Sequence, residues 1–218
     1  MSAWIEGTVV RLRPWTDELY SLQLKADIPS FTAGQFARLA LDIDGERVAR
    51  PYSFVNSPDN PVLEFYFIVV PNGPLTHELI RLQPGDTVYI ASRAAGFFIP
   101  SEVPDAKVLW MLSTGTAIGP FLSILGEDAV WERFKKIVLV HAVRTAAELT
   151  YQDEINTLLE NHPEQLQMIP FVSRKDSPLA IRGRVPDAIQ DGRLEARTGI
   201  PLNADNSQVM ICGNPAMV

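Results

Sequence analysis

The pattern of apolar residues changes near residue 100 of this 218-residue chain, and the change restricts the folds open to it. Before it, short runs rich in β-branched and aromatic residues alternate with turn signals such as Asp42-Ile43-Asp44-Gly45 and Gln83-Pro84-Gly85-Asp86. Such runs at this spacing predict a small antiparallel barrel or sandwich. The predicted strands are Ile5–Leu12, Tyr20–Leu24, Gln35–Leu41, Val48–Phe54, Leu63–Val69 and Thr87–Ala91, and one helix is expected over Leu75–Leu82.

After Phe97-Phe98-Ile99-Pro100, nearly continuous apolar runs alternate with helical segments. Continuous apolar runs are typical of strands covered on both faces, and strands that alternate with helices predict a doubly wound parallel sheet. The predicted strands are Val108–Leu112, Ile137–Val143, Gln167–Val172 and Gln208–Cys212, and the predicted helices are Pro120–Leu125, Leu149–Glu160 and Val185–Gln190.

A polar segment with two prolines, Pro100–Asp105, separates the two patterns. The length of the chain suits two domains of about 100 residues each, so we predict one domain over residues 1–100 and another over residues 106–218. Pro215 has the position of a proline in the first turn of a helix. The few residues that remain cannot nucleate one, so we expect the second domain to be incomplete at its C-terminus.

Charge and cysteine content exclude several classes of function. The formal net charge is −7, whereas a nucleic-acid-binding surface is normally basic. The single cysteine, Cys212, excludes an intrachain disulfide and an iron–sulfur centre held by four thiolates of this chain. His77, His141 and His162 show no metal-ligand spacing, so no metal site is expected.

One uncharged run, Val108–Gly126, has the length of a membrane span. Ser113-Thr114-Gly115-Thr116 and Gly119-Pro120 interrupt it, and a buried strand, a polar loop and a helix account for it better. The first residues also lack the basic start and apolar run of a signal peptide. We therefore expect a cytoplasmic protein with no membrane span.

The segment Arg50-Pro51-Tyr52-Ser53 offers a cation, an aromatic face and a hydroxyl on one predicted strand. Alternation puts Arg50 and Tyr52 on one face and Ser53 on the other. An arginine can hold a phosphate, a tyrosine can lie against a planar ring, and a serine can donate to a ring nitrogen. This set suits a flavin, although an ordinary strand with an exposed arginine has the same residues.

Two further segments stand where a strand gives way to a helix. Pro71-Asn72-Gly73-Pro74-Leu75-Thr76 opens a predicted helix, whose free N–H groups can receive an anion. Gly115-Thr116-Ala117-Ile118-Gly119-Pro120 follows the first strand of the second half, where a doubly wound sheet binds dinucleotides. Neither is a complete motif, and both also fit plain helix entries.

Polar and cationic residues gather after the third strand of the second half. Ser173, Arg174, Arg182 and Arg184 can hold the 2′-phosphate of NADP, or they can be solvated loop residues. Cys212 ends the last apolar strand, where it is either a small buried residue or a contact to the reacting ring of a nicotinamide.

Taken in order, these segments resemble the ferredoxin–NADP(+) reductases, specifically the bacterial branch also called flavodoxin reductases. The segments that carry the resemblance are Ala33-Gly34-Gln35-Phe36, Arg50-Pro51-Tyr52-Ser53, Val70-Pro71-Asn72-Gly73-Pro74-Leu75-Thr76, Thr114-Gly115-Thr116-Ala117-Ile118-Gly119-Pro120, Val172-Ser173-Arg174, Gly183-Arg184-Val185-Pro186 and Cys212-Gly213-Asn214-Pro215. Many relatives have a glycine in place of Ala117, and family members continue for roughly a further helix and strand. The resemblance implies a six-stranded antiparallel Greek-key barrel that binds FAD, then a parallel α/β domain that binds NADP, with the isoalloxazine at the seam.

The resemblance also implies roles for individual residues. Ser53 and Cys212 match the positions beside the reacting rings, so we expect them to be the catalytic residues. The expected FAD contacts are Arg50, Pro51, Tyr52, Ser53, Tyr66, Phe67, Ile68, Pro74, Leu75 and Thr76, with Thr116 near both flavin and nicotinamide. The expected NADP contacts are Val143, Arg144, Ser173, Arg174, Arg184, Asn214, Pro215 and Ala216, with Arg182 added from the cationic cluster.

The function implied is electron transfer from NADPH, through FAD, to ferredoxin or flavodoxin in a transient complex, by a protein that we expect to be a monomer. Two alternatives stay open. The reductase component of an oxygenase shares both domains, and a non-catalytic flavin-binding sensor or scaffold needs the flavin alone. Turnover of NADPH separates an enzyme from such a module.

Overall fold

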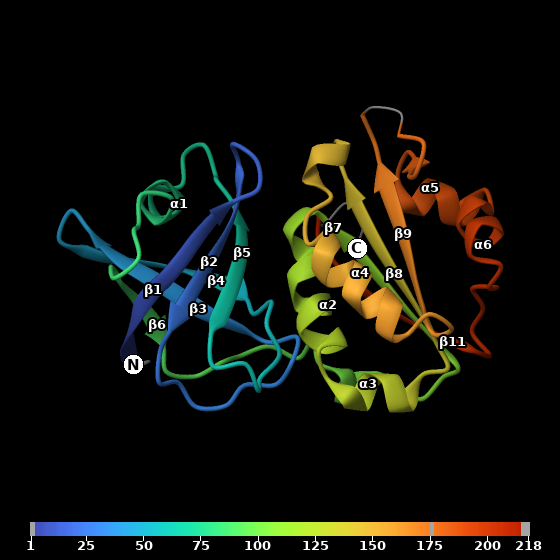
Figure 1. Cartoon of the computed structure of the whole chain (residues 1–218), viewed down its shortest axis with the longest axis horizontal. Coiled ribbons are helices and arrows are strands. Elements are labelled where there is room, and N and C mark those ends of the chain that lie inside the picture. Colours follow the sequence, from blue (N-terminus) through green and yellow to red (C-terminus); the bar gives the residue numbers. More distant parts are fainter. Residues whose placement is uncertain (1–2, 175–176, 215–218) are drawn as a thin grey trace. The chain divides into compact units, whose positions relative to one another are not determined.

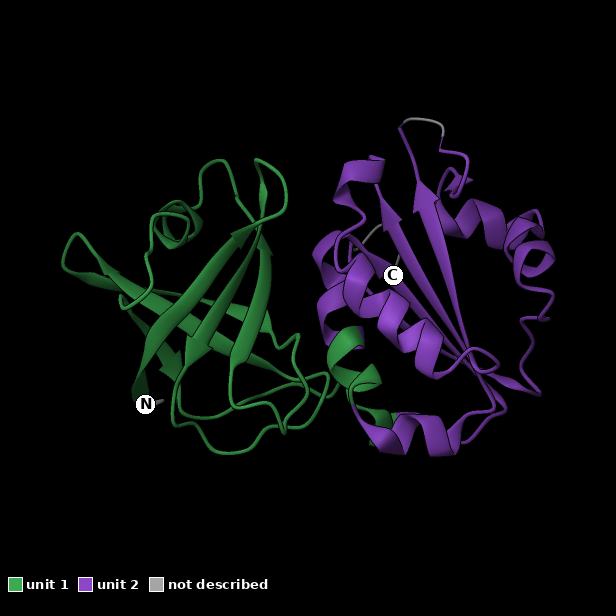
Figure 2. Cartoon of the chain, in the orientation of Figure 1, with its two compact units in different colours: residues 1–102, 122–126 green, residues 103–121, 127–218 purple. Residues whose placement is uncertain are grey.

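The computed structural model describes residues 3–174 and 177–214. The chain forms two compact units, one over residues 1–102 together with 122–126, the other over residues 103–121 together with 127–218 (Figure 2). Each unit has a sheet and a hydrophobic core of its own.

The first unit is built on six antiparallel strands in the spatial order β4-β3-β6-β1-β2-β5. Because β6 lies between β3 and β1, neighbours in the sheet are not always neighbours in sequence, as in a Greek key. A bridge between Phe54 and Phe65 joins the end of β4 to β5 and closes the ring of strands, so the predicted six-stranded barrel is confirmed. The elements are β1 (Trp4–Pro14), β2 (Leu19–Lys25), β3 (Phe36–Ile43), β4 (Glu46–Ser53), β5 (Leu63–Ile68), α1 (Pro74–Leu79) and β6 (Thr87–Ala91).

The inside of this barrel is filled by every second residue of its strands. Leu22 and Leu24 on β2 and Leu39 on β3 are fully buried. Phe54 stacks on Phe31 with ring centroids 3.8 Å apart and meets Phe65 at 5.0 Å. Aromatic pairs of this kind add about 0.5–1.5 kcal/mol beyond the area they bury. The bridge at Phe54 therefore also anchors the core, directly after the last residue of β4.

The second unit is a five-stranded parallel sheet in the order β10-β9-β8-β7-β11. Figure 1 shows α2 and α4 on one face of this sheet and α5 and α6 on the other. The predicted doubly wound arrangement is confirmed. The strands are β7 (Val108–Thr114), β8 (Lys136–Val143), β9 (Leu166–Val172), β10 (Ile181–Arg182) and β11 (Ser207–Cys212), and the helices are α2 (Ile118–Leu125), α3 (Asp128–Arg133), α4 (Gln152–Asn161), α5 (Val185–Gln190) and α6 (Arg193–Thr198). The residues of α2 from Leu122 onward are grouped with the first unit.

Trp110 ties β7 to the edge strand β11 of this sheet. Its side chain on β7 is fully buried, and its indole Nε1–H donates to the hydroxyl of Ser207 on β11 at 3.2 Å. Burial of so large a ring stabilises the fold by several kcal/mol, about 3–5 when judged by its removal. The pairing of β7 with β11 is thus held by side chains as well as by the ladder.

The uncharged run from Val108 to Gly126 divides as expected. It forms β7, a 3₁₀ turn over Gly115–Ala117 and α2. Within the ranges that the structure describes, no helix is long and apolar enough to cross a membrane.

Among the described residues, two short α-helices and one short strand were not predicted, and one helix begins later than predicted. The unpredicted elements are α3, α6 and the two-residue β10. The helix expected from Leu149 begins instead at Gln152, because Tyr151 has a left-handed backbone with φ of 57° and so stops the helix from extending backwards.

Candidate functional site

In the first unit, the candidate site is centred on the last residues of β4. The register pairs Arg50 with Leu39 and Tyr52 with Ala37, two residues whose side chains fill the barrel. Ser53 pairs with Phe36 and lies on the other face of β4. The alternation expected from the sequence is therefore present, with Arg50 exposed and Tyr52 and Ser53 half-buried.

Tyr52 is held at the edge of the barrel core. Its ring meets Phe67 edge-on, with centroids 5.9 Å apart. Burial raises the pKa of Tyr52 to about 12, and the nearby charge of Arg50 opposes this only in part. The phenol is therefore neutral at physiological pH. Arg50 donates one guanidinium N–H to the carbonyl of Ala49 at 2.7 Å, and the side chain stays exposed.

The expected residues on β5 divide between the two faces of that strand. Phe67 lies in the barrel core and contacts Tyr52, so the structure brings these two together. Tyr66 and Ile68 lie on the opposite face. Tyr66 is 5% exposed and meets Trp15 edge-on at 6.4 Å, whereas Ile68 is 37% exposed. Only Ile68 of the three therefore offers an accessible apolar surface.

At the start of α1, the side chain of Thr76 closes the turn that leads into the helix. Its hydroxyl donates to the carbonyl of Gly73 at 3.2 Å and accepts the N–H of Val70 at 3.1 Å. The side chains of Leu75 and Thr76 are buried, and Pro74 has no N–H. Any contact of this segment with an anion is therefore made by the main chain rather than by these side chains.

In the second unit, the strand order reverses between β7 and β11, which is where doubly wound sheets bind ligands at the carboxyl ends of their strands. Thr114 at the end of β7 and Gly213 after β11 meet at this point. The Thr114 hydroxyl accepts the N–H of Asn214 at 2.8 Å. A Cβ on Gly213 would lie 2.0 Å from that hydroxyl, so only glycine allows this approach.

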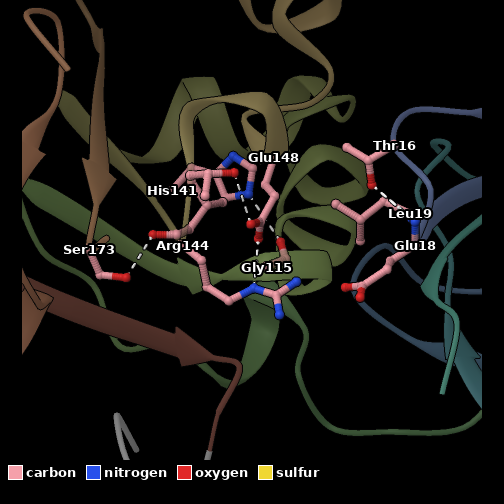
Figure 3. A network of polar contacts seen from close by, with 10 residues as sticks. Thr16, Glu18, Leu19, Gly115, His141, Arg144, Glu148 and Ser173 are labelled. Atoms are coloured by element: carbon pink, nitrogen blue, oxygen red, sulfur yellow. Dashed lines mark hydrogen bonds and ion pairs between the residues drawn. The ribbon is translucent and has the colours of Figure 1, made fainter. Parts of the chain in front are cut away.

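The turn after β7 carries Thr116, which is half-buried. The turn begins at Gly115, whose φ of +54° favours glycine. The carbonyl of Gly115 receives a hydrogen bond from Nε2 of His141 on β8 at 3.0 Å (Figure 3). His141 is fully buried, and burial lowers its pKa to about 4. Its Nδ1 has no hydrogen-bond partner among the described residues.

His141 is the residue at this site that sequence reasoning missed, since it was considered only as a metal ligand. The signal was present: a histidine interrupts the apolar run of a strand that is covered on both faces. What the sequence did not show was its partner, which lies 26 positions away in the chain.

The polar and cationic residues expected to hold NADP gather at the carboxyl ends of β8, β9 and β10. Ser173 donates its hydroxyl to the carbonyl of Val143 at 3.3 Å, and the N–H of Arg174 donates to the carbonyl of Arg144 at 2.9 Å. Gly183, with φ of +115°, donates to the carbonyl of Val172 and so keeps its neighbours beside β9. The structure thus brings the expected set together, with Ser173, Arg174, Arg182 and Arg184 all exposed.

Arg144 is engaged in an ion pair with Glu148. Its Nε lies 3.2 Å from a carboxylate oxygen of Glu148, whose other oxygen accepts the hydroxyl of Thr145 at 3.1 Å (Figure 3). The guanidinium is held in place at the end of β8, while 40% of the side chain stays exposed.

Cys212 lies at the carboxyl end of β11, opposite Ser113 of β7. It is half-buried, and burial raises the pKa of its thiol. The sulfur is therefore protonated at neutral pH and is not an activated nucleophile. Asn214 is exposed beside it, and the expected contacts Pro215 and Ala216 lie outside the described residues.

The residues present fit the two cofactors that the sequence implies. In the first unit, a neutral Tyr52, an exposed Arg50 and Ser53 offer a ring, a cation and a hydroxyl. In the second, the side-chain-free Gly213 and the positive-φ Gly115 leave backbone accessible at the switch point. Exposed guanidiniums lie at the ends of β9 and β10, which are the second and third strands from β7 in the sheet.

Comparison with known proteins decides the family. Residues 15–97 match the oxidoreductase FAD-binding domain and residues 111–218 match the oxidoreductase NAD-binding domain. The whole chain is 51% identical to a flavodoxin/ferredoxin–NADP reductase of Shigella flexneri and 50% identical to one of Escherichia coli (strain K12), and covers 88% of each. The chain belongs to the flavodoxin/ferredoxin–NADP reductase family. The family resemblance seen in the sequence is confirmed.

A solved structure of this family has the same fold. The ferredoxin NADP+ reductase from Neisseria gonorrhoeae with bound FAD and NADP matches the whole chain with a TM-score of 0.94 and 30% identity, and 88% of that protein is covered. The two-part architecture of this flavodoxin/ferredoxin–NADP reductase family member, a barrel followed by a doubly wound sheet, is therefore that of its family.

Proposed function

We propose that this protein is an FAD-dependent oxidoreductase that transfers electrons from NADPH to ferredoxin or flavodoxin. The observation that carries the proposal is the relationship along the whole chain to reductases named for these carriers. The residues of both expected cofactor sites are present in the matching units. When bound, FAD supplies the redox chemistry, a two-electron exchange with NADPH and one-electron exchanges with a protein carrier.

We assign the FAD site to residues 1–100. Arg50 would pair with a phosphate, Tyr52 would lie along the flavin ring, and Ser53 would donate its hydroxyl to a ring nitrogen. The half-buried ring of Tyr52 supports this assignment, because its edge-on contact with Phe67 holds it in place. The remaining contacts would come from Pro51, Tyr66, Phe67, Ile68, Pro74, Leu75 and Thr76, with the main chain of the last three facing the pyrophosphate.

We assign the NADP site to residues 106–218. The 2′-phosphate would be held by Ser173, Arg174 and Arg184, with Arg182 beside them, and Arg144 would be presented by its pair with Glu148. Exposed guanidiniums are well suited to this role, since they bind phosphate in a bidentate manner and stay charged at every physiological pH. Thr116, Val143, Asn214, Pro215 and Ala216 complete the proposed set.

Two side chains would act at the reacting rings without acid–base chemistry. Ser53 would orient the flavin through its hydroxyl. Cys212 would set the position of the nicotinamide through its protonated, half-buried sulfur, whose raised pKa argues against covalent chemistry. The protein's contribution to the rate would then be orientation of the two reacting rings.

The finer features of the partnership are also proposals. Electron-transfer complexes bury small interfaces and dissociate quickly, which supports a transient complex with the carrier. We also propose that the reductase is a monomer. The lone free cysteine is consistent with a cytoplasmic protein. Light scattering coupled to size exclusion tests the monomer.

The proposed function is tested by supplying the purified protein with NADPH and either ferredoxin or flavodoxin. We expect the carrier to be reduced and the denatured protein to release one FAD per chain. A protein that binds FAD and leaves NADPH unoxidised would instead be a flavin-binding sensor or scaffold. A reductase that reduces neither carrier would point to the reductase component of an oxygenase.

A further inference from the structure

A polar ring stands inside an otherwise apolar strand of the second unit. Ile137, Val138, Leu139 and Val140 on β8 are fully buried, and His141 continues this run with no exposed surface. A buried polar group costs free energy unless it is hydrogen-bonded. His141 has two ring nitrogens to satisfy, and only one of them has a partner among the described residues.

The single hydrogen bond fixes the tautomer of the ring. The carbonyl of Gly115 can only accept, so Nε2 of His141 carries the proton and donates it across 3.0 Å. Nδ1 is then a buried acceptor without a donor. An apolar side chain of similar size would remove that unsatisfied atom. The histidine leaves Nδ1 unsatisfied, but it makes a hydrogen bond to Gly115 that an apolar side chain cannot make.

Hydrogen bonds restrain the left-handed backbone of Gly115. Its φ is +54°, and apart from its two chain neighbours no heavy atom among the described residues lies within 4 Å of the position that a Cβ would occupy. Its carbonyl also receives the N–H of Ile118, which closes the 3₁₀ turn Gly115–Ala117. With both lone pairs of this oxygen engaged, the orientation of the first peptide of the turn is fixed.

A second hydrogen bond restrains the residue just before the turn. The hydroxyl of Thr114 accepts the N–H of Asn214 and so fixes the end of β7 to the loop after β11. The turn that carries Thr116 is thereby held from both neighbouring strands, through Asn214 after β11 and through His141 on β8. Both restraints lie at the point where the strand order reverses.

We propose that His141 is a positioning residue, whose Nε2–H holds the Gly115–Ala117 turn in the conformation that receives the nicotinamide end of NADPH. This rests on the proposed function for the identity of the ligand. The geometry of the turn does not depend on which ligand binds, and this geometry can be measured without NADPH.

The kinetic test uses three variants of the FAD-loaded protein. His141→Phe and His141→Leu remove the donor, whereas the side-chain amide of His141→Gln can replace Nε2–H. At saturating NADPH, we expect the single-turnover rate of flavin reduction to fall about ten-fold in His141→Phe and His141→Leu, the factor that about 1.4 kcal/mol represents. Gln should recover the rate to within about three-fold. The affinity for 2′-phospho-AMP, which lacks the nicotinamide, should be unchanged in all three.

An unchanged rate of flavin reduction in His141→Phe and His141→Leu overturns the proposal. A loss of rate that is equally large in His141→Gln also overturns it. Equal losses of 2′-phospho-AMP affinity and rate would show a general loss of structure and would overturn it as well.

A spectroscopic test separates this proposal from the proposed function. In the protein without NADPH, the ¹⁵N spectrum of the His141 imidazole should show the neutral Nε2–H tautomer. In His141→Phe, the amides of Thr116–Ile118 should exchange at least ten-fold faster, while those of Leu109–Leu112 on β7 stay protected. An Nδ1–H tautomer or unchanged exchange at the turn overturns the proposal. A wild-type protein that shows these spectra and fails to oxidise NADPH would contradict the proposed function instead.

Discussion

Arg174 follows β9 and Arg184 follows β10. These two strands lie furthest from the point between β7 and β11 where the strand order reverses. A charged hydrogen bond to a phosphate is worth about 1.5–3 kcal/mol. Replacing either residue with alanine should therefore lower kcat/KM for NADPH by about 10- to 150-fold. The value for NADH should stay unchanged, because NADH lacks the 2′-phosphate. Steady-state kinetics with both cofactors measures the difference.

The matched control for these variants is Arg197→Ala. Arg197 is exposed in the last turn of α6 and has no place in the proposed site. Its replacement should leave kcat/KM unchanged for both NADPH and NADH. Equal losses with NADPH and NADH in the Arg174 and Arg184 variants would show that these guanidiniums do not bind the 2′-phosphate.

Ser53 and Cys212 have half-buried side chains at strand ends, so their truncation leaves small voids near the surface rather than in the core. Ser53→Ala and Cys212→Ala should retain FAD and the melting temperature of the parent. Flavin reduction should slow about ten-fold in each, the effect of about 1.4 kcal/mol lost from ring orientation. Stopped-flow absorbance gives the rate. For Cys212, an unchanged rate combined with lower stability would mean that the residue serves packing alone.

His141 makes the stability of the protein depend on pH in a defined window. Its pKa is about 4 in the folded protein, chiefly because of burial, against 6.5 in its unperturbed state, and the hydrogen bond to Gly115 and the charge of Glu148 oppose the shift only in part. Between these values the unfolded chain binds a proton that the folded chain does not. The free energy of unfolding is therefore unaffected by the titration of His141 above pH 6.5. As the pH falls from 6.5 toward 4, it decreases by up to about 3 kcal/mol.

The variant His141→Phe should lack this dependence. Urea unfolding at pH 7 and pH 4.5 should show a smaller loss of unfolding free energy in the variant than in the parent, by about 2–3 kcal/mol. Equal losses in the two proteins would mean that His141 is accessible to protons in the folded state.

At the scale of elements, the loop before β3 depends on one glycine. Gly34 has φ of +94°, and a Cβ there would lie 2.0 Å from the carbonyl oxygen of Phe98. Gly45 in the β3–β4 turn has φ of +82° with open space around it. Gly45→Ala should cost only the left-handed backbone penalty of about 1–2 kcal/mol. Gly34→Ala should cost at least about 2 kcal/mol more, since backbone must move. Chemical denaturation of both variants tests this, and equal costs would contradict it.

The main elements of both sheets could be predicted from the sequence because their residues follow regular patterns. The runs around Val108 and Ile137 are continuous in apolar residues, and turn signals separate the strands of the barrel. All ten predicted strands are present, with ends that differ by a few residues.

The missed elements are short and depend on tertiary contacts. β10 is two residues long and is defined by its pairing with Phe171 and Val172. α6 is six residues between two left-handed glycines, Gly192 and Gly199, and buries only Leu194 and Thr198. Segments of this length carry too little periodicity to be recognised, and helices so short are stabilised by packing rather than by propensity.

The candidate site could be predicted only in part for a related reason. The residue types at Arg50, Tyr52 and Arg174 suggest their ligands by themselves. The role of His141 depends on a partner at the end of the neighbouring strand, β7, and the division of the β5 side chains between core and surface depends on strand register. Neither is visible in a single sequence.

At the scale of the whole molecule, the two units combine one candidate site for each cofactor on a chain of net charge −7. Net charge does not report the local distribution that a carrier meets. Exposed cations occur in both units, among them Arg50 on β4 and Arg174 after β9. The sign of the total charge therefore does not argue against an acidic carrier.

The most direct test of the account is anaerobic mixing of the FAD-loaded protein with one equivalent of NADPH while the flavin absorption is followed. The account predicts that the absorption bleaches within a single turnover, that NADH in its place is much slower, and that added ferredoxin or flavodoxin restores the oxidised spectrum. A flavin spectrum that stays unchanged with NADPH would contradict the claim that this protein moves electrons from NADPH to a carrier.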